Sequence, residues 1–311
     1  MMNNKTTPQL MHNFGAPVEE SEPYSPRLIK HTQYLTNMKL ICRLASAVQQ
    51  HRGSTMASLS GCISFFGRIK ELQDIINKSF FALKLNSLQH DEILHRSQLS
   101  HAIMDWHSIQ QGWQNDTVLD NYEFHGHLIS ALNKMSKQFL DEILEGCDQE
   151  LRLQHETFFH TILVELLGFI EQIAKLRGLS TNSTVIKACG PESYSRISFL
   201  IKDIRTKNNE LTSQISALSG DYEYLPSLQK LHKQKQRIKK IARIVERKIL
   251  NTRVIVESSE DLFELMTEII DVQWSILETG LDLADRLIFD GLYVHSKLDK
   301  NASVQPKFNP E

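Results

Sequence analysis

Apolar residues recur along most of the chain at intervals of three and four, which is the spacing of an amphipathic α-helix. No segment alternates between β-branched and polar residues between hairpin turns, so we predict essentially no sheet. Turn and cap residues such as Gly190-Pro191 separate several of the periodic segments. The pattern predicts an all-α fold of eight helices, at residues 30–60, 63–84, 88–113, 121–145, 153–187, 192–218, 226–250 and 257–296.

A seven-residue pattern, R-G-x-[ST]-x-x-S, occurs twice, at residues 52–58 and 177–183. Each arginine continues the apolar stripe of its predicted helix, so each belongs to a face that should be buried. The guanidinium groups of Arg52 and Arg177 stay protonated inside a protein, and an unpaired buried charge costs on the order of several kcal/mol. Each copy therefore introduces a cation into the core that another group must neutralise.

A second shared pattern, R-I-x-x-L-x-x-x-I, follows each copy, at residues 68–76 and 196–204. The offset between copies grows from 125 residues at the first pattern (177 − 52) to 128 at the second (196 − 68), as expected if one loop is longer. We therefore predict two related halves, about 27–147 and 148–297. Each half should form an up-and-down four-helix bundle, and the two bundles can share long helices.

Composition narrows the class of protein. The chain has 311 residues, of which 41% are hydrophobic, and a formal net charge of −2, which gives no general attraction to nucleic acid or anionic membranes. We expect flexible tails at residues 1–26 and 298–311, where prolines lie among polar residues. No signal-peptide pattern and no uninterrupted apolar run of about 18 residues appears, so we expect a cytoplasmic protein without a membrane span. The four cysteines are far apart and contain no C-x-x-C, which indicates reduced thiols rather than a zinc site.

With its paired R-G-x-[ST] helices, the chain resembles the nitrate- and nitrite-sensing (NIT) domain family. Residues 48–53, V-Q-Q-H-R-G, are similar to the family's Q-x-E-R-G-x-S start, with His51 in place of the usual glutamate. Residues 172–180 resemble the second arginine-bearing helix, and residues 121–129 resemble the end of the first half in stand-alone members. The resemblance implies two four-helix bundles that bind nitrate or nitrite between arginines from the two motif helices. No output module is visible, so a separate output protein or a homodimer is expected to carry the signal.

The residue types suit a planar anion. A guanidinium presents paired donors that engage two oxygens of nitrate in a fork, and hydroxyls one helical turn away can donate further bonds. A glycine inside a helix costs about 1 kcal/mol relative to alanine, so we expect it to permit close helix packing or to leave room for a ligand. Without ligand, the two like charges would push the halves apart, and a ligand that bridges them would shift the bundles relative to one another. The expected ligand-binding residues are Arg52, Arg177, Thr55, Ser180, Gly53 and Gly178.

Other interpretations stay open at this stage. The arginines can be structural, paired with Glu165 or Glu123, and the chain is then a helical scaffold or adaptor. The basic stretch 230–248 can contact nucleic acid, but the next predicted helix carries an acidic stripe that can satisfy it, so we do not expect nucleic-acid binding.

No metal, cofactor or enzymatic activity is expected. The pair His155 and His160 and the pair His125 and His127 both diverge on a helix, so neither has metal-ligand spacing. No nucleophile-plus-base pattern emerges. The three tryptophans are expected to fill the core. They are Trp106, Trp113 and Trp274.

Overall fold

The computed structural model describes residues 26–62, 65–89, 96–147, 149–218 and 226–303, and these residues confirm the all-α prediction because they contain no strand. The α-helices are α1 (Pro26–Leu59), α2 (Phe66–Gln89), α3 (Arg96–Gly112), α4 (Val118–Gly146), α5 (Gln149–His160), α6 (Leu166–Val185), α7 (Pro191–Leu218), α8 (Pro226–Val245) and α9 (Ser259–Ser303). A π-helical turn, Thr161–Glu165, joins α5 to α6, so the two labels describe one continuous rod that was predicted as a single helix.

One helix end differs from the prediction in an informative way. The last helix continues to Ser303, so the tail predicted from residue 298 is wrong in its first six residues. Residues 298–303 contain neither proline nor glycine, and nothing in them stops a helix. The remainder of that tail and residues 1–25 lie outside the described residues.

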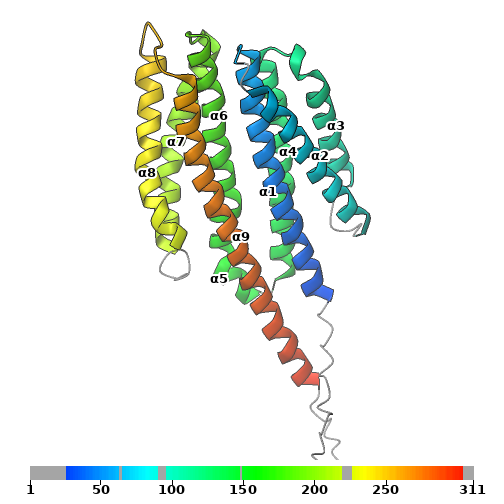
Figure 1. The fold of residues 1–311 in the computed structure, drawn as a ribbon. Coiled ribbons are helices and arrows are strands. Elements are labelled where there is room, and N and C mark those ends of the chain that lie inside the picture. The colour runs from blue at the N-terminus through cyan, green and yellow to red at the C-terminus, as the bar shows by residue number, and fades with distance from the viewer. Residues whose placement is uncertain (1–25, 63–64, 90–95, 148, 219–225, 304–311) are drawn as a thin grey trace, which may run out of the picture.

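The helices pack as two groups that correspond to the two halves of the sequence (Figure 1). In the first group α1 packs against α2 and α4, and α3 packs against α4. In the second group α6 packs against α7 and α9, and α8 packs against both α7 and α9. The groups meet where α1 contacts α6 and α9, so the two motif helices lie at the junction.

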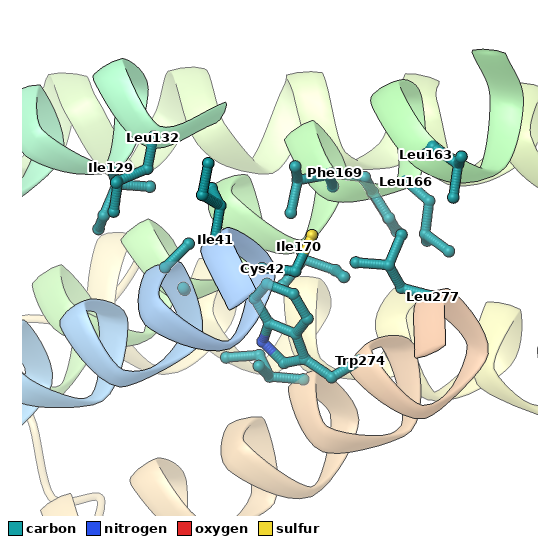
Figure 2. Close-up of a cluster of buried hydrophobic side chains, with 14 of the residues drawn as sticks. Ile41, Cys42, Ile129, Leu132, Leu163, Leu166, Phe169, Ile170, Trp274 and Leu277 are labelled. Atoms are coloured by element: carbon teal, nitrogen blue, oxygen red, sulfur yellow. The ribbon is translucent and has the colours of Figure 1, made fainter. Parts of the chain in front are cut away.

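The second shared pattern occupies equivalent positions in the two halves. Its apolar residues are buried on α2 and on α7, as the repeat predicts: Ile69, Leu72, Ile76, Ile197, Leu200 and Ile204. The core is continuous across the junction, because Ile41 of α1, Ile170 of α6 and Trp274 of α9 belong to one buried cluster (Figure 2). The other two tryptophans, Trp106 and Trp113, are also buried, which confirms their predicted role.

One helical rod, Gln149–Val185, is long and apolar enough to cross a membrane, with a mean hydropathy of 1.3 over its most apolar window. Of that window, 67% is buried inside the protein. Its neighbours α1, α4, α7 and α9 cover it, so packing in the core accounts for its apolar composition.

Candidate functional site

The two R-G motifs face each other across the contact between α1 and α6. A β-carbon added to Gly178 would lie 3.0 Å from Sδ of Met56. A β-carbon added to Gly53 would lie 3.4 Å from Nη2 of Arg177 and 3.2 Å from Cε2 of Phe263. The glycines therefore make room for side chains of the opposing elements, and at Gly53 one of those side chains is the second motif arginine.

The guanidinium of Arg52 is neutralised inside the protein. Its Nη1 donates to Oε1 of Glu171 at 2.7 Å and its Nη2 donates to Oε2 at 3.1 Å, so the pair forms a two-bond fork. Arg52 is 0% exposed and Glu171 is 6% exposed. The Tyr122 ring of α4 covers the other side, with its centroid 5.6 Å from Cζ of Arg52. Such a buried pair is complete without a ligand.

The carboxylates expected from the sequence to pair with the arginines lie elsewhere. Glu165 contacts Nδ1 of His160 at 3.2 Å, and Glu123 accepts a hydrogen bond from Arg196. Glu171 lies on the face of α6 that contacts α1. The periodicity of α6 alone does not show which neighbouring helix this face contacts. The prediction that Glu165 or Glu123 pairs with the arginines was therefore wrong. An internal salt bridge does form at Arg52, but its carboxylate is Glu171.

The guanidinium of Arg177 is buried without such a partner. Arg177 is 1% exposed; its Nη1 donates to Oγ1 of Thr267 at 2.8 Å and its Nη2 to the carbonyl of Gln49 at 3.3 Å. Its Nε–H has no acceptor and, among the described residues, no carboxylate forms an ion pair with it. The ring of Phe263 lies over it, with the centroid 4.7 Å from Cζ. These contacts are neutral, so they leave the charge of Arg177 unbalanced.

The lowered pKa of Arg177 reflects this unbalanced charge. Burial, and after it the neighbouring charges of Arg52 and Arg68, lower the pKa of Arg177 from its usual value to about 9. Asp271 and Glu171 oppose that shift but do not cancel it. A pKa of about 9 still leaves the guanidinium protonated at pH 7, so the site holds an under-compensated cation.

The two hydroxyls predicted as ligands have other partners. Oγ1 of Thr55 lies 2.7 Å from Oδ1 of Asn121 on α4, to which it can donate, and 2.9 Å from the carbonyl of His51. Oγ of Ser180 lies 2.6 Å from the carbonyl of Leu176, one turn earlier in its own helix. No hydrogen bond joins either hydroxyl to a motif guanidinium among the described residues, because each hydroxyl instead lies close to a backbone carbonyl of its own helix.

A buried histidine pair lies beside the site and was not predicted. Nδ1 of His51 lies 2.8 Å from Nε2 of His125, and Nδ1 of His125 lies 2.7 Å from the carbonyl of Asn121. Since that carbonyl only accepts, Nδ1 of His125 carries a proton and its Nε2 accepts from His51. Burial lowers the pKa of His51 to about 3 and that of His125 well below its usual value. Both imidazoles are therefore neutral at pH 7. The sequence signal was His51 in place of the family's glutamate.

A surface pocket of about 400 Å³ lies directly outside Arg177. Phe263 and Thr267, the two α9 residues that contact the guanidinium, line it. Charged residues from α2 and α9 complete its wall: Arg68, Glu260, Glu264, Glu268 and Asp271. The guanidinium is thus separated from the pocket by the side chains of Phe263 and Thr267.

The sequence analysis expected the basic stretch 230–248 to pair with acidic residues of the next helix, and one such contact is present. Nη2 of Arg237 on α8 lies 2.6 Å from Oε2 of Glu268 on α9. This contact joins two neighbouring helices of opposite charge. No disulfide joins the four cysteines, all of which lie among the described residues.

No family model, curated protein or solved structure matches the chain. The resemblance to the NIT family therefore rests on the motifs described above. The functional argument rests on how Arg52, Arg177 and Glu171 are arranged.

Removal of the two motif arginines should affect stability unequally. Arg52→Met leaves the Glu171 carboxylate buried without its main partner and should lower the free energy of unfolding by about 3 to 5 kcal/mol. Arg177→Met removes an unbalanced cation and places an apolar side chain beside Phe263, so it should change stability little or raise it. Urea denaturation in nitrate-free buffer measures both values. Equal losses in the two variants would contradict the assignment of Arg177 as the unbalanced charge.

The histidine pair should make the protein sensitive to acid. The unfolded chain binds a proton at His51 near pH 6.5, but the folded chain does so only near pH 3, so stability falls as the pH drops through this range. Between pH 6.5 and pH 5 the loss for one such histidine is about 2 kcal/mol. We expect His51→Asn to show a smaller loss of unfolding free energy between pH 7.5 and pH 5 than the wild type. His101→Asn, which removes an exposed imidazole, is the control, and an unchanged slope in His51→Asn would refute the prediction.

Proposed function

We propose that the chain is a sensor of a small monovalent anion, nitrate or nitrite, which binds at Arg177 between the two helical groups. One observation carries the proposal: Arg177 is a fully buried guanidinium with no carboxylate partner among the described residues and with a free Nε–H donor. The resemblance of the two motifs to the NIT family supports the choice of anion.

The physical support begins with the energy of a buried charge. A protein retains an unpaired buried cation at the expense of stability, and charged groups of this kind concentrate at functional sites. An anion that binds Arg177 would supply the missing counter-charge and accept the Nε–H bond. The folded state would then gain stability with ligand concentration.

The shape of the cation favours a planar ligand. Nε and the Nη groups of Arg177 lie in one plane, so a planar anion can accept two parallel hydrogen bonds from an edge of the guanidinium. Nitrate and nitrite both present two oxygens at such an edge. Arg52 lies close enough to lower the pKa of Arg177 and therefore also attracts the anion through space, while its own donors stay with Glu171.

The pocket outside Phe263 and Thr267 offers a route to the site. Rotation of the Phe263 ring would open the guanidinium to that pocket, whose wall carries the cation Arg68 together with four carboxylates, Glu260, Glu264, Glu268 and Asp271. Both contact residues belong to α9, whose C-terminal end extends past the other helices (Figure 1). We propose that ligand binding shifts α9 against α1 and α6, and that a separate output protein or a second copy of the chain responds to this shift.

A second function is favoured by a different observation. The Arg52–Glu171 fork is complete and buried without any ligand, which is what a purely structural arginine requires. On this alternative the chain is a helical scaffold or adaptor, and nitrate has no effect on it.

Nitrate titration separates the two functions. We expect the wild type to bind nitrate or nitrite in calorimetry in preference to chloride and sulfate. We also expect the free energy of unfolding to rise by about 2.7 kcal/mol at a hundredfold excess of ligand over Kd. Arg177→Gln should weaken binding about a hundredfold or more, because it removes charge-assisted hydrogen bonds.

The control for this titration is Arg196→Gln, which removes an arginine from the surface and should bind nitrate as the wild type does. The absence of nitrate and nitrite binding in the folded wild type would support the scaffold. Unchanged binding in Arg177→Gln would place the anion elsewhere.

A further inference from the structure

The two motif arginines differ in how their charges are balanced, and Glu171 causes the difference. This carboxylate accepts two hydrogen bonds from Arg52 and a third from Nε2 of Gln49, at 2.9 Å. The backbone carbonyl of the same Gln49 accepts from Arg177. Glu171 is therefore fixed on the Arg52 side of the cluster, and the contacts of Arg177 are with neutral groups.

The buried cluster of Arg52, Arg177 and Glu171 carries a net charge of +1. Arg52 and Arg177 contribute two positive charges, Glu171 contributes one negative charge, and all three are at least nine-tenths buried. Nζ of Lys175 lies 3.8 Å from Oε1 of Glu171, but this lysine is only half-buried and its charge is screened by solvent. A single negative charge would therefore neutralise the buried groups, whereas a dianion would leave an excess negative charge away from water.

We propose that Glu171 sets the valence of the ligand: it acts as an internal anion that occupies Arg52 and restricts the cluster to one monovalent anion. This inference rests on the proposed function and assigns a residue, Glu171, to its selectivity for a monovalent anion. Sulfate and hydrogen phosphate are excluded by charge, in addition to any mismatch of shape. Glu171 is thus a residue that determines specificity without contacting the ligand.

The test changes the charge of the cluster while keeping its shape. Glu171→Gln is close in size, retains an acceptor for Arg52 and raises the buried charge from one to two. We expect this variant to bind two negative charges at saturation, either as a second equivalent of nitrate or as one sulfate that the wild type does not bind. The double variant Arg52→Gln/Glu171→Gln removes both charges of the fork and returns the net value to one. It should bind one nitrate and no sulfate.

These titrations test whether Glu171 sets the valence of the ligand. If the wild type binds one nitrate and Glu171→Gln also binds one nitrate and no sulfate, the valence rule is wrong and the anion site stands. If the double variant takes up two charges, charge does not set the stoichiometry and the rule is again wrong. If Glu171→Gln does not fold, the wild type and the double variant still test the rule, since both must exclude sulfate. If the folded wild type binds neither nitrate nor nitrite, the proposed function itself fails.

Discussion

Two guanidinium groups and one carboxylate share the packed junction of α1, α6 and α9, and this unequal charge pairing is the constraint on which the site depends. The fork between Arg52 and Glu171 joins the two helical groups through hydrogen bonds that water does not screen. Among the residues that the structure describes, Glu171 is the one carboxylate buried at the junction, so Arg177 is left with neutral partners. A structural ion pair and an unbalanced cation therefore arise from the same arrangement.

Neighbouring features are consistent with this surplus of positive charge. His51 is adjacent to Arg52 in the chain and bonds to His125, and the charge of Arg52 helps to lower the pKa of His125. Because both imidazoles are neutral, they place polar groups near the arginines without adding to the excess positive charge. Gly53 allows the Phe263 ring and the Arg177 guanidinium to approach α1, and the ring shields the cation from the pocket outside. Shielding from water strengthens the interaction that an incoming anion would make.

The sequence predicted the helical class and the burial of both arginines, because these depend on local periodicity. It could not identify Glu171 as the partner of Arg52, since that depends on which face of α6 meets α1. The sequence indicates Thr55 and Ser180 as ligands because they lie one turn from an arginine, but their hydroxyls are close to backbone carbonyls of their own helices. The pairing of His51 with His125 also joins distant segments, and only the packing of α1 on α4 brings them together.

The most direct test of the unbalanced charge is the arginine side-chain ¹H–¹⁵N spectrum of the labelled protein during titration with nitrate. The Nε–H signal of Arg177, assigned by its loss in Arg177→Lys, should move progressively and saturate as the free donor gains an acceptor. The Arg52 signal should move little, because its fork with Glu171 persists. An Arg177 signal that stays in place at high nitrate concentration in the folded protein would contradict the account.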